Sequence, residues 1–498
     1  MNDQNNLLQT FERLLQEWRP VFSQERTFDR ARRLGTGLLV CLRAPLTTNA
    51  ITAVGRHYQD WSGDYRVMSR SPWDPRRLFD VIFRHLPAFL PPNNGPVLVA
   101  LDDTSCRKTG RKIPGVSTLR DPRSLPYHVN LYRGHRFVQI SVLLFSLLKP
   151  GPARAIPVRF EPAPVAAQPK VPKTKAGKKA KLSKAAQTEL QQQQEAYEYA
   201  KLPQVAVRGI ASVRHQLDQS PATADSPLVV LVDASYTNKN VLPHLPERTV
   251  LIGRIRKDAR LNYPLPDPRP AGTHPNQRYG PTVPTPDQLL HDKTVPFVKV
   301  QAFAAGQVRS FEVKVITPLV WRKAGPAQLL QLVVIKPVGY RLSLGSRVLY
   351  REPAFLICTD PDLPLAQLLQ AYLYRWEIEC NHRDEKSYLG VDAGHVRSPQ
   401  SVTRLPQFQV ALYSLLQLAT LITFGFGRTA DFLPLPKWRN RPPVRPSIND
   451  ILNLFRSQLF NQALSTQAPF SDFANLGPQN TNGLNPLVIP RQLALPAS

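Results

Sequence analysis

The stretch PPNNGPVLVALDDTS, residues 91–105, marks a change in the character of the sequence. The proline, asparagine and glycine residues at 91–96 are typical of a turn. Val97 to Leu101 then form an uninterrupted apolar run of strand length, which is typical of a strand buried on both faces. Two acids, Asp102 and Asp103, follow directly. The stretch therefore predicts a buried strand that carries carboxylates at its C-terminal end.

A second stretch repeats this pattern. In SPLVVLVDASYT, residues 226–237, the apolar run from Leu228 to Val232 is followed by Asp233. This run also has the length and composition of a strand buried on both faces. We therefore expect two buried strands that each end in an acid.

A third candidate acid lies in YLYRWEIECNHRDEKSYLG, residues 372–390, which is predicted to be helical. At about 100° per residue, four side chains fall within about 60° of one another on such a helix. They are Tyr372, Arg375, Glu379 and Lys386. The neighbouring acids fall outside this stripe; they are Glu377, Asp384 and Glu385. If an acid of this helix joins the strand-end acids, it should be Glu379.

Three acids in one place need a compensating cation, because like charges at short distances repel and raise one another's pKa. Two Mg²⁺ ions are the economical compensation, with Mn²⁺ as an alternative, since hard divalent cations bind carboxylates and substrate phosphates together. Such a pair of ions activates a water or a 3′-hydroxyl and stabilises the departing oxygen during phosphoryl transfer. Arg375 and Lys386, on the same helix face, would contact phosphates.

The order of these features resembles the DDE transposases of bacterial insertion sequences that carry a Y-R-E-K signature. The features are two strand-end aspartates, a β-rich segment, and the spacing Tyr372-x2-Arg375-x3-Glu379-x6-Lys386. The resemblance covers roughly residues 60–425. It implies an α/β fold in which an RNase H-like catalytic core is interrupted by a mostly antiparallel β insertion, with a helical N-terminal domain. It also implies cleavage of transposon ends and strand transfer into target DNA.

The resemblance also assigns roles to individual residues. The first acid corresponds to the strand-end pair, where Asp103, which precedes Thr104, is the preferred metal ligand and Asp102 is close behind. The second and third catalytic acids and metal ligands correspond to Asp233 and Glu379. The expected DNA contacts are Tyr372, Arg375 and Lys386 from the signature, and Arg254, Arg256 and Lys257 from the segment LIGRIRKDARL. The implied partners are terminal inverted repeats and target double-stranded DNA, held by a homodimer.

Composition agrees with a polyanionic partner. Lys and Arg exceed Asp and Glu by 64 − 36 = 28, and nucleic acid is the commonest partner of so basic a chain. The four cysteines form no C-x-x-C pair, which argues against a zinc site and a disulfide framework. The N-terminus has no secretory signal pattern, so we expect a cytoplasmic protein. The resemblance to insertion-sequence transposases implies a bacterial, nucleoid-associated one. Residues 405–427 carry no charge, but polar residues interrupt them, and we expect a core helix and no membrane contact.

The chain divides into five expected regions. Residues 1–92 form a helical, DNA-binding domain, and residues 93–257 form the first part of the catalytic core. The core contains a hairpin near Gly134 and a Pro-, Lys- and Gln-rich insert at about 150–200, whose first part reads as a mobile linker. Residues 258–362 form the β-rich insertion, 363–430 the helical remainder of the core, and 431–498 a loose, Pro-rich C-terminal region.

Each feature also has a simpler explanation. Acids at strand ends are often turn caps, and Glu379 with Arg375 and Arg383 could be an ordinary ladder of surface ion pairs. Two other functions therefore stay open beside the transposase: a transposase-derived nuclease without strand transfer, and a non-catalytic DNA-binding protein.

Overall fold

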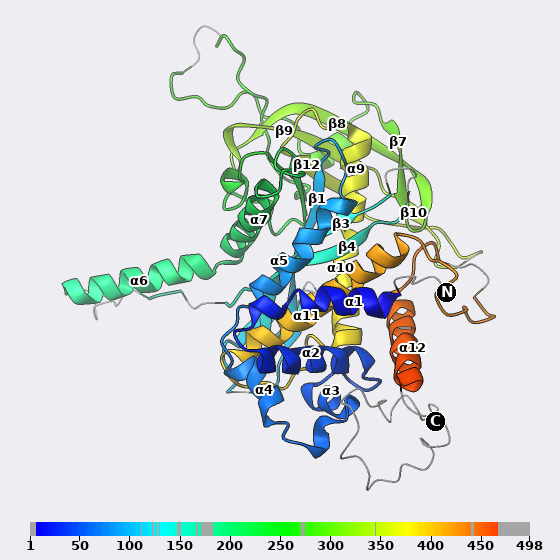
Figure 1. Ribbon diagram of the computed structural model, residues 1–498. Helices are drawn as coiled ribbons and strands as arrows, with labels where there is room; N and C mark the ends of the chain where they lie inside the picture. The colour runs from blue at the N-terminus through cyan, green and yellow to red at the C-terminus, as the bar shows by residue number, and fades with distance from the viewer. Residues whose placement is uncertain are drawn as a thin grey trace.

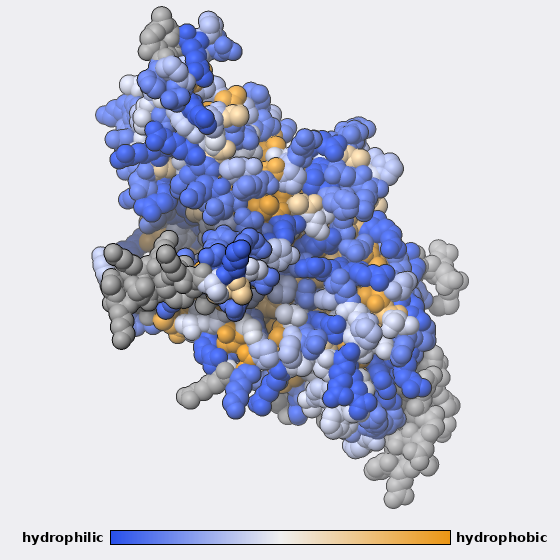
Figure 2. Space-filling model, turned by 90° about the vertical axis from the view of Figure 1, so that its left-hand side faces the viewer, coloured by the Kyte–Doolittle hydropathy of each residue, from blue (hydrophilic) through white to orange (hydrophobic). Residues whose placement is uncertain are grey.

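The protein has an α/β fold built on one mixed sheet, with helices on both faces of the sheet (Figure 1). The computed structural model describes residues 6–466 except 111, 122–123, 126, 129, 147–150, 166–167, 171–182, 270–273, 344 and 440–442. Within this part of the chain, ten strands form the sheet, in the order β2-β3-β1-β5-β6-β12-β9-β8-β7, with β4 also paired to β3. Seen from the side that carries α6, the surface is mostly hydrophilic, with apolar residues in small separate groups (Figure 2).

Five strands make up the half of the sheet that contains the predicted acids. They are β1 (Val97–Arg107), β3 (Leu131–Leu144), β4 (Arg154–Pro162), β5 (Leu228–Val232) and β6 (Thr249–Arg254). β4, β3 and β1 are antiparallel, whereas β1, β5 and β6 are parallel. Because parallel strands need a crossover connection, the chain passes through α7 (Leu202–Asp218) between β4 and β5.

The segment predicted as a β insertion continues the same sheet. Its strands are β7 (Val298–Ala304), β8 (Gln307–Trp321), β9 (Gly325–Ile335) and β12 (Ala354–Cys358), and all of them pair antiparallel. β12 pairs with β6, which joins this part to the central strands. The smaller elements are β2 (Ser117–Arg120), β10 (Gly339–Tyr340), β11 (Leu349–Tyr350), α8 (Pro286–His291) and 3-10 turns at Arg19–Val21, Arg56–Tyr58, Leu86–Phe89 and Leu242–His244.

Side-chain alternation along β1 divides the core into two clusters. Val97, Val99 and Leu101 pack on the face covered by the N-terminal helices, α7 and α11 (Ser401–Phe424). Leu98 and Ala100 pack on the opposite face, which is covered by α9 (Leu365–Tyr374) and the start of α10 (Trp376–Leu389). This is the expected geometry of a strand buried on both faces.

The helices of residues 1–92 share the main core with the sheet. They are α1 (Leu7–Gln16), α2 (Glu25–Val40), α3 (Thr47–Ala53), α4 (Ser62–Ser69) and α5 (Arg76–His85). Their apolar side chains belong to the same cluster as the sheet and α11, and the Trp18 ring lies 5.9 Å from that of Phe408 on α11. The helical region is therefore packed into the protein and has no core of its own.

The uncharged helix α11 (Ser401–Phe424) lies inside the protein. It is the one described helix that is long and apolar enough to cross a membrane, but 94% of its apolar window is buried. Its glutamines are paired, since Gln407 donates to the Phe160 carbonyl at 2.9 Å and Gln409 donates to the Leu389 carbonyl at 2.6 Å. These bonds satisfy the side-chain amide nitrogens of both glutamines.

Two predictions for the central region were wrong. The first part of the Pro-rich insert contains β4, whose residues are mostly buried, so this part is a core strand rather than a linker. The hairpin at Gly134 does not form, because β3 runs straight through this residue. Further along the insert, α6 (Lys184–Ala200) projects from the body with no buried residue (Figure 1). The lysine-rich residues 171–182 lie outside the described residues.

The C-terminal region is less peripheral than predicted. α12 (Ile448–Thr466) packs against α1, and the rings of Phe455 and Phe11 lie 5.0 Å apart. Arg456 also donates to the Leu39 carbonyl at the end of α2, at 3.0 Å. Residues 467–498 lie outside the described residues.

Candidate active site

Three neighbouring strands bring two acids and an arginine to one edge of the sheet. β1 and β5 are parallel, and their last pair is Ala100 with Leu231. Two residues further on, the same register places Asp102 beside Asp233. The register of β5 and β6, continued one residue past the end of their ladder, places Asp233 beside Arg254. Adjacent strands are about 4.8 Å apart, so these side chains start from neighbouring positions.

The pleat of β1 decides which of its two acids joins this row. Asp102 follows Leu98 and Ala100 on the face that α9 and α10 cover. Asp103 follows Leu101 on the opposite face, because successive side chains of a strand alternate. The structure therefore directs Asp102 toward the helices that carry the Y-R-E-K residues and Asp103 away from them.

These helices supply the other charged groups. The predicted continuous helix is divided at Arg375, where the backbone keeps helical angles (φ −51°, ψ −31°) but changes its hydrogen bonds. Arg375 N–H bonds the carbonyl of Tyr372, and Ile378 N–H bonds the carbonyl of Arg375, so both bonds span three residues, as in a 3-10 turn. Burial of Ile378 against the sheet fixes the start of α10 and directs Glu379 toward the strand ends.

The groups from strands and helices line one open cavity of about 300 Å³. Its charged lining consists of three acids and two arginines, with Ala234 and Ile255 as the remaining residues. The charged residues are Asp102, Asp233, Glu379, Arg254 and Arg375. Acids that are remote in the sequence therefore share one pocket.

Arg375 balances the charge of this pocket. Its Nη1 lies 3.5 Å from Asp102 Oδ2 and its Nη2 lies 2.8 Å from Glu379 Oε1, so the guanidinium bridges a strand acid and a helix acid. Burial and the nearby Asp233 carboxylate raise the pKa of Asp102 to about 7, although Arg375 opposes this rise. A group that titrates near neutral pH in a cavity is typical of a functional site.

The cavity contains the kind of oxygen ligands that divalent cations bind. In this structure, however, its carboxylates are not spaced to hold such an ion. Carboxylate oxygens are the ligands that Mg²⁺ and Mn²⁺ prefer. In the part of the chain that the structure describes, no group of three His, Cys, Asp or Glu side chains is arranged to hold a metal ion. The Arg375 guanidinium stands between Asp102 and Glu379 and contacts both carboxylates.

Asp103, the preferred first ligand of the sequence analysis, does not line this cavity. Its Oδ1 accepts a hydrogen bond of 2.9 Å from the hydroxyl of Tyr236. Burial raises the pKa of the Asp103 carboxyl, and the bond from Tyr236 counteracts that rise. The geometry thus favours Asp102, the alternative, as the strand acid of the pocket.

The remaining predicted DNA contacts do not line the pocket. Tyr372 is partly buried, and burial raises its pKa, whereas the neighbouring Arg375 opposes this rise. Lys386 is not part of the cavity lining. Arg256 and Lys257 are exposed on the loop after β6, where Arg256 pairs with Asp258 at 2.8 Å.

The other acids of α10 point away from the pocket, as the helical spacing predicted. Glu377 and Asp384 line a second cavity, and Glu377 pairs with Arg445 there at 2.7 Å. Glu385 is buried and accepts a 3.0 Å hydrogen bond from Gln139 on β3. Burial raises the pKa of Glu385 to about 8.

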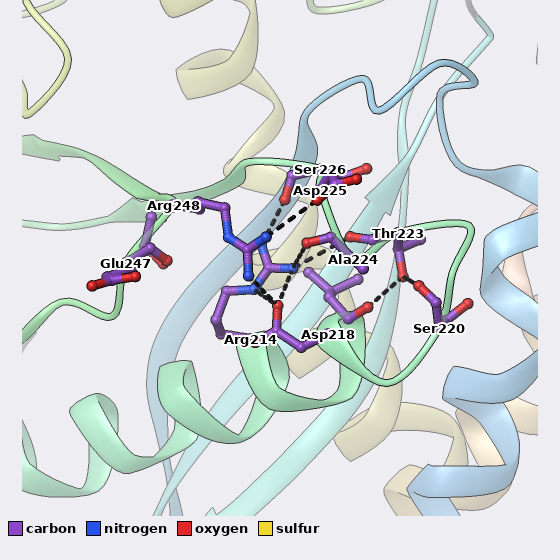
Figure 3. Close-up of polar contacts among 11 residues, drawn as sticks. Arg214, Asp218, Ser220, Thr223, Ala224, Asp225, Ser226, Glu247 and Arg248 are labelled. Carbon is purple, nitrogen blue, oxygen red and sulfur yellow. Dashed lines mark hydrogen bonds and ion pairs between the residues drawn. The ribbon is translucent and has the colours of Figure 1, made fainter.

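A buried arginine holds the loop that leads into β5 (Figure 3). Arg214 on α7 donates to the carbonyls of Ser226 at 2.6 Å and Ala224 at 3.1 Å, and it pairs with Asp218 at 2.9 Å. Arg248, just before β6, also pairs with Asp218 at 2.8 Å. The entries of β5 and β6 are thereby tied to α7, which supports the placement of Asp233 and Arg254 at the other ends of these strands.

Sequence reasoning missed two buried contacts outside the pocket, that of Tyr236 with Asp103 and that of Gln139 with Glu385. Tyr236 follows Asp233 by three residues, but nothing in the sequence indicates that it reaches β1. Gln139 and Glu385 are 246 residues apart, and only the pairing of β3 with β1 and the docking of α10 bring them together.

Comparison with known proteins agrees with this geometry. A search of curated proteins gave no match. A family model described as DDE superfamily endonuclease matches residues 18–313, which is more than half of the chain. The matched range contains Asp102 and Asp233 and ends before Glu379, so the third acid of the pocket rests on the structure alone. The chain belongs to the DDE superfamily of endonucleases.

Proposed function

We propose that the protein is a transposase of an insertion sequence that cleaves DNA ends and joins them to target DNA. Family membership implies a nuclease or phosphoryl-transfer enzyme that acts on DNA, in a superfamily that normally uses divalent metals. The observation that carries the proposal is the shared cavity of Asp102, Asp233 and Glu379. The order of these acids along the chain and the Y-R-E-K spacing support the more specific assignment.

The strand order supports an RNase H-like core. In the order β4-β3-β1-β5-β6, three antiparallel strands are followed by two parallel ones, and α7 makes the crossover. In such a sheet the first and second acids lie on the two central strands, where the parallel pairing of these strands ends. Asp102 lies within β1, which continues past the predicted strand end to Arg107, and it is two residues beyond the last pair with β5; Asp233 directly follows β5.

We propose that Asp102, Asp233 and Glu379 hold two Mg²⁺ ions, which Mn²⁺ can replace. When bound, such ions activate the attacking oxygen and stabilise the leaving oxygen of the phosphate. Arg375 would exchange its carboxylate partners for a DNA phosphate, since a guanidinium binds either group with two parallel bonds. Arg254, on the pocket wall, would bind the adjacent phosphate. Asp102 and Arg375 are the least exposed of the paired charges in this pocket, with side chains 19% and 13% exposed, and this partial burial strengthens their interaction.

We propose residues 1–92 as a second DNA contact. Burial is the main cause of the raised pKa of Asp64, and the cations of Arg33, Arg56 and Arg30 surround this carboxyl and oppose the rise. The Arg30 guanidinium rests on Gly63, where any Cβ would collide with it. Nearby, Tyr58 and Trp61 are 78% and 51% exposed, which is unusual for aromatic side chains. Clustered arginines with exposed aromatics are typical of nucleic-acid surfaces.

The biological setting follows from the same proposal. The substrates are the terminal inverted repeats of the element and a target duplex, and two subunits pair the ends. The protein acts in the bacterial cytoplasm at the nucleoid. The alternatives are a transposase-derived nuclease that cleaves without joining, and a DNA-binding protein without catalysis.

One experiment separates these functions. Full-length protein is incubated with Mg²⁺ and DNA carrying the ends of the element, and cleaved and joined products are separated on gels. Wild type should give both products, whereas Glu379→Gln should bind the DNA and give neither. Glu377→Gln is the matched control, because Glu377 is on the same helix but pairs with Arg445 in the second cavity. Cleavage without joining identifies a nuclease, and cleavage by Glu379→Gln at the wild-type rate rejects the proposed site.

A further inference from the structure

Asp103 has a position that the proposed chemistry does not use. It directly follows the proposed ligand Asp102 but lies on the other face of β1. Its partner Tyr236 is fully buried, and the 2.9 Å bond between the Tyr236 hydroxyl and Asp103 Oδ1 crosses from the β5 side to β1. A hydrogen bond between a partly buried carboxylate and a buried hydroxyl is costly to break.

Tyr236 belongs to the turn that holds the backbone and side chain of Asp233 in place. Asp233 Oδ1 accepts from the Ser235 backbone N–H at 2.8 Å, and the Thr237 hydroxyl donates to the Asp233 carbonyl at 3.1 Å. The turn also packs on β6, where a Cβ at Gly253 would collide with the Thr237 hydroxyl. A movement of Tyr236 would therefore move the Asp233 backbone.

The backbone ladder ends before the two proposed ligands. The last pair of β1 and β5 is Ala100 with Leu231, two residues short of Asp102 and Asp233. Past this pair, the hydrogen bond from Tyr236 to Asp103 joins the two segments. A side-chain bond on the back face of the sheet thus links the two segments that carry the proposed ligands.

We propose that Asp103 is a positioning residue that, through Tyr236, sets the spacing of Asp102 and Asp233 for metal binding. This inference rests on the proposed function, since it concerns the same site. Asp103 acts through its ability to accept a hydrogen bond rather than through its charge. The substitution Asp103→Asn keeps an acceptor oxygen for the Tyr236 hydroxyl, whereas Asp103→Ala removes it.

The test measures Mn²⁺ binding by titration calorimetry on full-length protein bound to a DNA duplex, with DNA alone subtracted. Tyr236→Phe and Asp103→Ala should keep the number of bound ions but weaken their affinity about tenfold, as is typical when the support of a ligand is lost. Unlike Asp103→Ala, the variant Asp103→Asn should bind Mn²⁺ with an affinity close to that of wild type. Asp102→Asn should lose a bound ion.

Tyr413→Phe is the matched control for the loss of a buried hydroxyl. Tyr413 is 2% exposed, and its hydroxyl donates to Asn381 at 3.2 Å on α10, away from the strand ends. This variant should bind Mn²⁺ like wild type, and thermal unfolding followed by circular dichroism shows whether each variant is folded. A weaker affinity in Tyr236→Phe at an unfolding temperature similar to that of Tyr413→Phe supports positioning.

Two results overturn the inference. Equal Mn²⁺ affinity in Tyr236→Phe and wild type means that the bond has no positioning role. Loss of a bound ion in Asp103→Asn makes Asp103 itself a ligand. The proposed function fails in a different way, namely if Asp102→Asn binds Mn²⁺ as wild type does, or if wild type binds none.

Discussion

Arg375 and Asp102 are 273 residues apart in the sequence, yet Nη1 of the arginine lies 3.5 Å from Oδ2 of the acid. The same guanidinium donates to Glu379 Oε1 at 2.8 Å. A cation of the protein thus compensates two of the acids that the proposed mechanism assigns to metal ions. Metal and DNA binding should be coupled, because a phosphate that attracts Arg375 frees the carboxylates.

The first prediction concerns this coupling. Arg375→Gln should raise the Mn²⁺ affinity of the DNA-free protein by about tenfold, within the usual range of coupling between sites. Titration calorimetry without DNA measures the change. Arg383→Gln is the control, since Arg383 is on the same helix but is 70% exposed and pairs with Asp384. Identical affinity in Arg375→Gln and wild type would show that Arg375 does not compete with the ions.

The second prediction concerns pH. The pKa of Asp102 is raised to about 7, so this carboxyl takes up a proton as the pH falls through neutrality. An ion must then displace the proton, and the Mg²⁺ concentration for half-maximal cleavage should rise about tenfold per pH unit below about pH 7. Cleavage rates across Mg²⁺ titrations at several pH values measure this. A constant Mg²⁺ requirement from about pH 6 to about pH 8 would contradict the prediction.

The third prediction concerns stability. Burial raises the pKa of Glu385 from 4.5 to about 8, so the folded protein binds this proton more tightly than the unfolded chain does. The free energy of unfolding should therefore fall as the pH rises from about 4.5 to about 8 and stay level above. Glu385→Gln keeps the acceptor for Gln139 but has no proton to lose. It should be more stable than wild type by about 2 kcal/mol or more above about pH 8, with a smaller gain at lower pH.

Urea unfolding at a series of pH values tests this stability effect. Glu377→Gln is a suitable comparison, because it removes an acid that is ion-paired with Arg445 and should lower stability instead. Parallel pH profiles for Glu385→Gln and wild type would show that Glu385 is not the group responsible.

The fourth prediction concerns the N-terminal helices. Arg66 is exposed on α4, close to the arginines around Asp64. If this surface contacts DNA, Arg66→Ala should weaken binding to all duplexes equally and reduce the slope of log affinity against log salt by about 1. Binding by fluorescence anisotropy at several salt concentrations measures the slope. Lys336→Ala is the control, because Lys336 is outside the N-terminal helices and its ammonium pairs with Glu312. The same salt slope in both variants would exclude the arginine surface around Asp64 as a DNA contact.

Much of the site could be predicted from sequence because its signals are local. An apolar run that ends in an acid identified Asp233 and the Asp102–Asp103 pair, and helical spacing separated Glu379 from Glu377. The choice between Asp102 and Asp103 was not local. It depends on which face of β1 the helix α9 covers, and one residue along a strand reverses the face.

The errors in the fold have similar causes. β4 was hidden by its prolines and arginines, yet Arg154 and Arg159 are buried and paired, with Arg154 bonded to the Pro446 carbonyl at 3.0 Å and Arg159 to Asp80 at 3.2 Å. Gly134 suggested a turn, but its lack of a Cβ allows β3 to approach the Cys106 carbonyl on β1. The joining of the β insertion to the sheet depends on the pairing of β12 with β6, which are remote in sequence and leave no local pattern.

The most direct test of the central claim is an anomalous difference map from crystals of the protein with DNA and Mn²⁺. The account predicts Mn²⁺ peaks within bonding distance of the carboxylates of Asp102, Asp233 and Glu379, with Arg375 moved onto a phosphate. Peaks ligated by Asp103, or an ion-free pocket with Arg375 still bridging Asp102 and Glu379 on bound DNA, would contradict it.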